Sequence, residues 1–577
     1  MPGRVTWYEH SDLTEKPIPR VLSRPVSRPG AVAGVVSFVL SLLPSLLPRG
    51  GLIQGIISGI SFMVGYAVGA ATQWAWHYLE IPVPGGRVWR TLRIVLYAAL
   101  AYLVVSRLWQ HVGWQNEVRD EFGMERIGPA VWIVIVPVAA VTAAVILVVV
   151  RSFRLLFHFI VRWLDRALPG RLARFLGGVA LALVIWGLWS GVLVNGFFTA
   201  ANQIFAPRDS STDEGVTAPT SPLRSGSPES WVPWETLGRQ GRNFVSSGPS
   251  LEELNAFHGG GAMESIRVYA GIKSAETVDG RARLVLDELI RTNAFDREVL
   301  VVATTTGTGF LEPNAMTALD YVTNGNVAVA GVQYSYLPSW ISLLADQEEV
   351  SVTSQQVFDI IHGYWSTLPS DERPEIYVYG LSLGSFGVES IISSIDILNE
   401  PIDGAFLVGP PFVNQMWNQI VSNRDGGSTP SEPIYEQGRT VRFIGPEDSA
   451  NAPRSEWAQT RVLYLQHATD PVVFFSPDLF FTRPDWLEEG QRDSKLVDEF
   501  VWVPGVTMWQ VLFDMALAAT VPEGYGHEYS KESNARGWVA VIDPGGWTEL
   551  ETDRLVRQMI ELGSASEVPD HLSQTTG

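Results

Sequence analysis

The feature that most constrains this chain is a set of apolar windows in its first 200 residues, none of which contains an ionised side chain. They cover residues 31–47, 52–75, 94–106 with its flanks, 129–150 and 175–194. A helix needs about 20 apolar residues to cross the hydrocarbon core of a bilayer. The windows therefore predict an all-helical membrane region over residues 31–200 with about five spans, preceded by a cytoplasmic tail over residues 1–30.

Positive charges predict how these spans are oriented. With five crossings, the tail and the loops 76–93 and 151–174 share one side and carry 14 Lys and Arg, against four arginines in the short loops of the other side. Cytoplasmic loops hold the excess of Lys and Arg in membrane proteins. The chain is thus predicted to be a multi-pass protein of the cytoplasmic (inner) membrane. Because five is odd, everything after Phe198 is expected on the extracytoplasmic face.

The rest of the chain has a different composition. Residues 1–200 carry 18 basic and 9 acidic side chains, whereas residues 201–577 carry 23 basic and 52 acidic ones. This acidity excludes a nucleic-acid partner, and the absence of cysteine excludes a thiol nucleophile and a cysteine-ligated metal. Ser, Pro, Gly and acidic residues dominate 206–230, so 201–235 is predicted as a linker; 561–577 is predicted as a polar tail.

Short β-branched runs alternate with helical patterns from about residue 264 onward, which predicts an α/β domain over 236–560 with a mostly parallel sheet covered by helices on both faces. In such sheets ligands bind at the carboxyl ends of the strands. The aromatic-rich residues 412–460 are predicted to form a cap over that edge, with ordinary surface loops as the alternative. The runs are Ile266–Ile272, Val299–Ala303, Val327–Val332, Ile376–Tyr379, Ala405–Val408 and Val462–Leu465.

A candidate nucleophile stands at the end of the fourth run. The sequence Gly380-Leu381-Ser382-Leu383-Gly384 is a G-x-S-x-G motif between a predicted strand and a predicted helix. The two glycines allow the sharp turn that lifts the Ser382 hydroxyl above the sheet. The motif alone occurs often by chance, but its strand and helix context favours a catalytic serine.

A serine hydroxyl needs a histidine to take its proton and a carboxylate to orient that histidine. Asp470 follows the strand Val462–Leu465, and His527 lies in a glycine-rich loop after an apolar helix predicted over 506–519. His571 belongs to the polar tail, which leaves His527 as the candidate base. Glu523 or Glu528 could replace Asp470 as the orienting acid. A metal site made by His467 and Asp470 is disfavoured because no third ligand is near, so no metal and no cofactor are predicted.

Two N–H donors should stabilise the oxyanion that forms when a serine attacks an acyl group. The N–H of Leu383, next to the nucleophile, is predicted to be the first. The second is expected from the Thr-rich and Gly-rich loop after Val299–Val302, with the backbone of Gly307 or Thr308 as candidates. His258-Gly259-Gly260-Gly261 resembles the oxyanion signature of lipases, but it precedes the first strand and is interpreted as a turn.

The order Ser382, Asp470, His527 resembles the alpha/beta-hydrolase superfamily. The membrane region, with Leu-Leu-Pro-Ser-Leu-Leu-Pro-Arg at 42–49, looks like that of the actinobacterial membrane-embedded alpha/beta-hydrolase family. The loop at 303–309 departs from ordinary lipases and is more similar to cutinase-like loops. This resemblance implies a hydrolase fold and leaves the substrate open.

The favoured hypothesis is a membrane-anchored serine hydrolase, an esterase or lipase, or an acyltransferase. It would act through an acyl-serine intermediate on an acyl ester of a cell-envelope lipid or glycolipid, with that lipid and the bilayer as its partners. Two alternatives stay open. One is a lipid-handling transporter or scaffold whose hydrolase domain only binds, and the other is a serine peptidase of the same fold.

Overall fold

The computed structural model of the chain describes residues 26–565 except 83–85, 189–195, 197–205, 339–340, 344–346, 395–396, 398–399 and 446–454. The chain divides into two compact units. The helical unit contains residues up to Leu43 together with Arg49–Gln115 and Ile127–Phe198. The sheet unit contains Pro44–Pro48, Asn116–Arg126 and everything from Thr199 onward.

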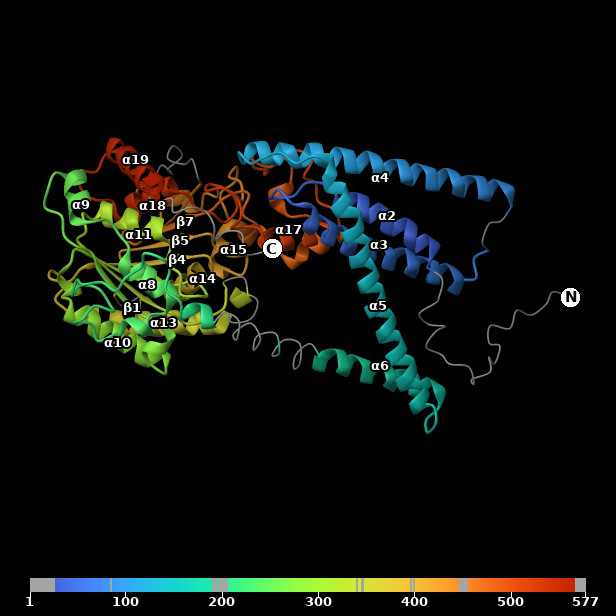
Figure 1. The fold of residues 1–577 in the computed structure, drawn as a ribbon, viewed down its shortest axis with the longest axis horizontal. Helices are drawn as coiled ribbons and strands as arrows, with labels where there is room; N and C mark the ends of the chain where they lie inside the picture. Colours follow the sequence, from blue (N-terminus) through green and yellow to red (C-terminus); the bar gives the residue numbers. More distant parts are fainter. Residues whose placement is uncertain are drawn as a thin grey trace. The chain divides into compact units, whose positions relative to one another are not determined.

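The described residues of the helical unit form five apolar helices (Figure 1). Four described segments are long and apolar enough to cross a bilayer, namely Gly51–Tyr78, Arg87–Glu121, Pro129–Leu164 and Gly170–Gly187. The helices are α2 Arg28–Ser41, α3 Gly51–Tyr78, α4 Arg87–Glu121, α5 Trp132–Leu164 and α6 Gly170–Gly187.

The described residues thus contain four candidate spans where the sequence predicted about five. The difference lies in the first window, because α2 has only 14 residues and ends at Ser41, just before Pro44. Proline cannot continue a helix, and about 20 residues are needed to span a bilayer. The odd number of crossings on which the predicted orientation rests therefore has no support from the helix count.

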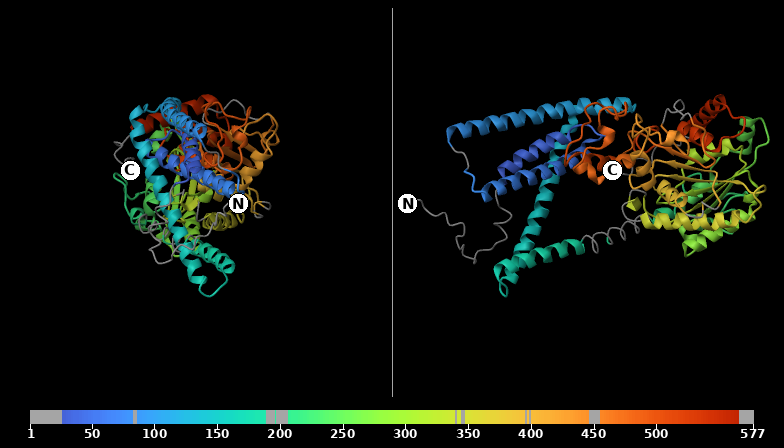
Figure 2. Two further views of the ribbon diagram at one scale, coloured as in Figure 1. Left: turned by 90° about the vertical axis from the view of Figure 1, so that its right-hand side faces the viewer. Right: turned by 180° about the vertical axis from the view of Figure 1, so that it is seen from behind.

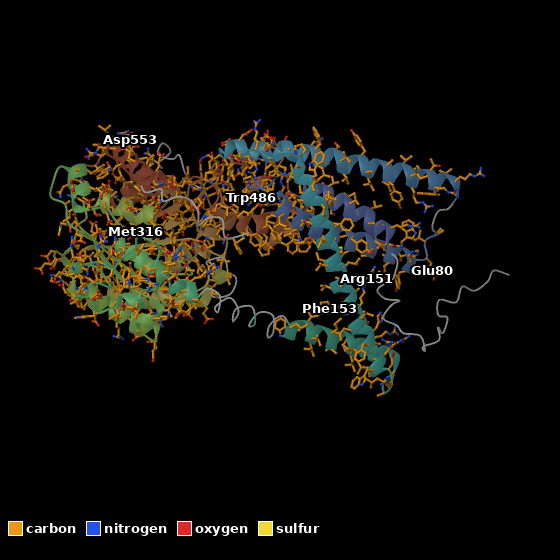
Figure 3. All side chains as sticks on the ribbon, viewed as in Figure 1. Glu80, Arg151, Phe153, Met316, Trp486 and Asp553 are labelled. Carbon is orange, nitrogen blue, oxygen red and sulfur yellow. The ribbon has the colours of Figure 1, made fainter. Side chains whose placement is uncertain are left out.

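Small residues bring α3 against α5. A β-carbon added to Gly55 would stand 2.6 Å from the β-carbon of Val138, and one added to Gly59 would stand 2.6 Å from that of Thr142. Elsewhere on its surface α5 carries exposed apolar side chains, such as that of Val141, which is 62% exposed. Other side chains of α5, including Phe153, project from the helix in Figure 3. Close packing on one side and apolar side chains on the other are typical of a membrane helix.

The sheet unit contains a seven-stranded, entirely parallel sheet with the strand order β1-β3-β2-β4-β5-β7-β6. The six predicted strands are all present. The seventh, β6, lies inside the segment predicted as a cap, so that prediction is wrong for 441–444. The strands are β1 Ile266–Ala270, β2 Val299–Thr304, β3 Val327–Val332, β4 Glu375–Leu381, β5 Gly404–Val408, β6 Val441–Ile444 and β7 Arg461–Leu465.

Helices cover both faces of this sheet, as the alternating pattern predicted (Figures 1 and 2). Helices α10 and α13 pack together near one face, and α11, α18 and α19 pack together near the other. Two separate apolar cores fill these layers. The helices of the unit are α8 Gly238–Ser246, α9 Leu251–His258, α10 Val278–Arg291, α11 Pro313–Val322, α13 Gln347–Trp365, α14 Leu383–Ile392, α15 Gln415–Ser422, α16 Pro471–Phe474, α17 Thr507–Met515, α18 Lys531–Ile542 and α19 Glu549–Ala565.

The segment 206–230 packs on the sheet unit, whereas the sequence predicted a linker there. The Ser225 N–H donates to the Arg267 carbonyl of β1 at 3.0 Å, and Arg224 pairs with Glu264 at 3.0 Å. Asp213 pairs with Arg239 of α8 at 2.7 Å. Polar side chains hold this segment by specific bonds, which its composition does not reveal. Of the predicted tail, everything after Ala565 lies outside the described residues.

Candidate active site

Ser382 occupies a sharp turn between β4 and α14. Its φ of 54° and ψ of −122° belong to a conformation that side-chain-bearing residues rarely adopt. Its N–H donates to the Val408 carbonyl of the neighbouring strand β5 at 2.7 Å, and its own carbonyl accepts from the Ser385 N–H at 2.8 Å. The strained turn is thus held from both sides, at the carboxyl edge of the sheet where ligands bind.

The two glycines of the motif are required by close backbone contacts. A β-carbon on Gly380 would stand 2.3 Å from the carbonyl of Gly384, and one on Gly384 would stand 2.4 Å from the Thr304 oxygen. Both distances are shorter than any van der Waals contact that a β-carbon makes. Glycine at these positions lets α14 start directly over the ends of β2 and β4.

Asp470 lies in the turn after β7 and is completely buried. Its Oδ2 accepts a hydrogen bond from His527 Nδ1 at 2.6 Å and another from the Tyr529 hydroxyl at 2.7 Å. Its Oδ1 accepts from the Val472 N–H at 2.8 Å, which caps the short helix α16. An ionised carboxylate can only accept, so the hydrogen of a neutral His527 sits on Nδ1 and Nε2 keeps its lone pair.

Two effects act in opposite directions on the pKa of His527. Burial lowers it, whereas the charge and the hydrogen bond of Asp470 raise it, and the net result is a pKa above the ordinary value. His467 behaves differently, because burial lowers its pKa to about 4. The ring of His467 packs against Tyr529, with centroids 4.2 Å apart and planes inclined by 31°, and its Nδ1 is 3.1 Å from the Gly526 carbonyl, which gives His467 a structural role.

Ser382 and His527 line one cavity of about 320 Å³. His527 Nε2 has no hydrogen-bond partner among the described residues, so it is available to a group inside the cavity. Side chains from α17 and the residues after it form one wall, and the surface is mainly apolar. The remaining lining residues are Thr306, Phe310, Glu312, Leu343, Leu381, Val472, Met515, Ala516, Ala518, Ala519, Glu528 and Tyr529.

Two carboxyl groups face this cavity. Burial is the largest effect on Glu312, the Asn314 N–H opposes it, and the charges of Glu528 and Glu523 add to it, so that the pKa is raised to about 8. Burial also raises the pKa of Glu528 to about 7, although His527 lowers it. Neither Glu523, which pairs with Lys531 at 2.9 Å, nor Glu528 takes the place of Asp470 beside His527 Nδ1.

The loop expected to hold the oxyanion donors differs in detail from the prediction. Leu383 is the first residue of α14, so its N–H has no acceptor within the helix. Thr306 lines the cavity, but its N–H donates to the Phe310 carbonyl at 3.0 Å. Gly307 and Thr308 do not line the cavity, and the Thr308 carbonyl instead accepts from the Gln333 side chain. Gly307 and Thr308 as the second oxyanion donor therefore remain a prediction.

Sequence reasoning missed several residues of the site. Tyr529, Glu312 and the α17 wall belong to no motif, and no described residue of the predicted cap 412–460 lines the cavity. The motif at His258 ends α9 with Gly259 in the left-handed conformation, which agrees with its interpretation as a turn. Within the described ranges, no three His, Asp or Glu side chains gather in a way that could hold a metal ion.

Comparison with known proteins finds two matches to family models. A sequence model of a protein family, described as the alpha/beta-hydrolase family, matches residues 266–555. A second one, described as the N-terminus of the alpha/beta-hydrolase family, matches residues 42–249. No curated protein and no solved structure matches the chain.

Proposed function

Because the chain belongs to the alpha/beta-hydrolase family, we propose that it is a membrane-associated serine hydrolase or acyltransferase with Ser382 as nucleophile. The observation that carries this proposal is the cavity shared by Ser382 and His527, with Asp470 bonded to the far side of the imidazole. A nucleophile, a base and an orienting acid in this relation form the arrangement that activates a serine.

The reaction would begin with attack of Ser382 Oγ on the carbonyl carbon of an ester. His527 Nε2 would take the hydroxyl proton, and the buried Asp470 carboxylate would stabilise the imidazolium. The Leu383 N–H would donate to the oxyanion. His527 would then protonate the departing alcohol, which leaves an acyl group on Ser382. Water or a hydroxyl group of an acceptor, activated by His527, would release that acyl group.

The lining of the cavity supports an apolar acyl group as the substrate's reacting end. Leu343, Val472, Met515 and Ala519 provide apolar surface, and the described residues that line the cavity include no Lys or Arg to hold an anionic group. Together with apolar helices of membrane-spanning length, this favours an acyl ester of an envelope lipid or glycolipid. The proposed position of the site is the extracytoplasmic face, and it rests on the five-span arrangement together with the distribution of Lys and Arg that this arrangement gives.

Labelling with a fluorophosphonate tests the nucleophile. Full-length protein in detergent should react at Ser382, Ser382→Ala should not react, and His527→Ala should react slower by orders of magnitude. Equal labelling of Ser382→Ala and wild type would contradict the proposal and would favour the binding-only alternative. Competition between the fluorophosphonate and either lipid esters or peptides then separates a lipid hydrolase from a peptidase of the same fold.

The proposed side of the membrane has a separate test. The chain contains no cysteine, so one cysteine introduced at the exposed Leu550 of α19 gives a unique reporter. A membrane-impermeant maleimide should label Leu550→Cys in intact, wall-stripped cells. Labelling only after permeabilisation would place the hydrolase domain in the cytoplasm instead.

A further inference from the structure

Two short segments from the amino-terminal third of the chain belong to the sheet unit. They are Pro44–Pro48 and Asn116–Arg126, here called the amino-terminal insert. Leu46, Leu47 and Phe122 of the insert are at most 3% exposed and are part of the core that also contains strands of the sheet. The insert contains most of the Leu-Leu-Pro-Ser-Leu-Leu-Pro-Arg sequence, to which the proposed reaction assigns no role. We propose that the insert positions the loop that carries His527 and the cavity wall beside it, an inference that rests on the proposed function.

The first contact holds the cavity wall. Ser45 Oγ donates a hydrogen bond of 2.5 Å to Oδ2 of Asp514 in α17, and the Leu47 N–H lies 3.4 Å from the same oxygen. Ser45 and Asp514 are both buried, at 3% and 0% exposure. Met515, which follows Asp514 directly, lines the cavity. A buried carboxylate needs its hydrogen bonds, so this contact constrains where α17 lies.

The second contact holds the histidine loop. The rings of Phe122 and Tyr525 stack with centroids 4.2 Å apart and planes inclined by 23°. The Tyr525 hydroxyl also donates to the Glu121 carbonyl at 2.6 Å. Only Gly526 separates Tyr525 from His527 in the sequence. The insert therefore fixes the backbone immediately before the catalytic base.

The third contact is at Gly526 itself. Its φ is 54°, and a β-carbon there would stand 2.8 Å from the Ala518 carbonyl and 3.4 Å from Leu47 Cδ2. The same Ala518 carbonyl accepts the N–H of His527 at 2.9 Å. Leu47 thus packs where α17 ends and the histidine loop returns. Asp470 and Tyr529 hold the imidazole from one side, and the insert holds the backbone that carries it from the other.

Contacts that position a catalytic group affect the rate of the chemical step more than they affect substrate binding. Catalytic groups displaced by about 1 Å can lose about 100-fold in rate, because proton transfer requires hydrogen-bond geometry in the transition state. Ser45 and Phe122 do not line the cavity, so they touch no substrate and are positioning residues. Their loss is expected to lower kcat and to leave KM almost unchanged.

The test measures turnover of a neutral p-nitrophenyl ester by the full-length protein in detergent. Phe122→Ala should lower kcat by about tenfold or more, with KM within about twofold of wild type. Phe122→Tyr, which keeps the stacked ring, should restore kcat. The matched control is Phe295→Ala. Phe295 is also buried, its ring centroid lies 4.7 Å from that of a tyrosine, Tyr364, and it does not line the cavity. If Phe295→Ala lowers kcat as much as Phe122→Ala does, the proposal is wrong.

Two further measurements cover variants that fold poorly and separate the two proposals. Tyr525→Phe removes the hydroxyl that donates to Glu121 and keeps the stacked ring, so it should fold and show a smaller loss of kcat. Amide hydrogen exchange over 517–529 should become faster in Ser45→Ala and Phe122→Ala, and this signal does not require activity. Unchanged exchange would overturn the positioning role. Absence of any Ser382 labelling in wild type would instead overturn the proposed function.

Discussion

Asp470 is completely buried and accepts three hydrogen bonds, one of them from the imidazole of His527. The hydrogen bonds from Val472 and Tyr529 hold the carboxylate in place, and its negative charge acts on the imidazole of His527. The pKa of His527 is therefore the balance between burial, which lowers it, and Asp470, which raises it. The rate should rise with pH through this raised pKa, because only neutral His527 can accept the serine proton.

Replacing Asp470 tests that balance. Asp470→Asn removes the charge that raises the pKa of His527 and keeps burial, so the acidic limb of the pH profile should move to lower pH. The maximal rate should fall by about 10⁴-fold, because the imidazole loses its orienting anion. The pH dependence of fluorophosphonate labelling measures both effects. The exposed Asp478→Asn is the control, and an unmoved acidic limb in Asp470→Asn would contradict the assignment.

Glu312 and Glu528 give the cavity a charge that depends on pH. A carboxyl is neutral below its pKa, so Glu528 ionises near pH 7 and Glu312 near pH 8. Between pH 6 and 9 the preference for a neutral ester over one with a carboxylate in its acyl chain should grow by about tenfold. The double variant Glu312→Gln, Glu528→Gln should show a flat preference, whereas Glu523→Gln should behave as wild type. A preference that rises equally in the double variant would assign the effect to another group.

At the scale of elements, the strands and the turn at Ser382 were predictable because they are local. Continuous β-branched runs indicate buried parallel strands, and G-x-S-x-G next to such a run indicates its turn. Strand β6 was missed because four residues, of which only Val441 is buried, form no distinctive run. The 206–230 segment was misread because its composition cannot show the bonds made by Asp213 and Arg224.

The turn itself can be tested with one methyl group. Gly384→Ala would push a β-carbon against the Thr304 oxygen, so stability should fall by about 1–3 kcal/mol and Ser382 should react more slowly. Gly363→Ala in α13 is the matched control, since nothing lies within 4 Å of the added carbon. Alanine is favoured there by about 0.5–1 kcal/mol. Thermal unfolding and fluorophosphonate labelling of both variants measure these effects. Equal stability and equal labelling of the two variants would show that the turn tolerates a side chain.

At the scale of the whole molecule, the sequence predicts least well which segments belong to the helical unit and which to the sheet unit. A boundary near residue 200 follows from the change in charge and hydropathy. The amino-terminal insert does not follow from either, because Ser45 and Asp514 are 469 positions apart and their contact has no local signal. Tyr529 was missed for the same reason, since its bond to Asp470 exists only in the folded chain.

A truncated chain tests this division. Residues 206–577 alone would lack Leu46, Leu47, Val118 and Phe122, each of which is buried in the full chain and each of which stabilises it by about 1.5–3 kcal/mol. The fragment should therefore unfold at a lower temperature than the same unit in the full chain and should label more slowly at Ser382. A fragment that melts and labels like the full-length protein would show that the insert is dispensable.

The insert also has a consequence for the order in which the protein is made. Its two segments leave the ribosome before Ser382, Asp470 and His527 have been synthesised. Each precedes an apolar helix in the sequence, α3 after Pro48 and α5 after Arg126. The residues that pack on the insert, Asp514 and Tyr525, are translated after both segments and both helices. Part of the core of the sheet unit, namely the insert, is thus synthesised together with the apolar helices and before the sheet itself. If the insert positions the histidine loop as proposed, the site can be completed only after both segments of the insert and the sheet have been synthesised.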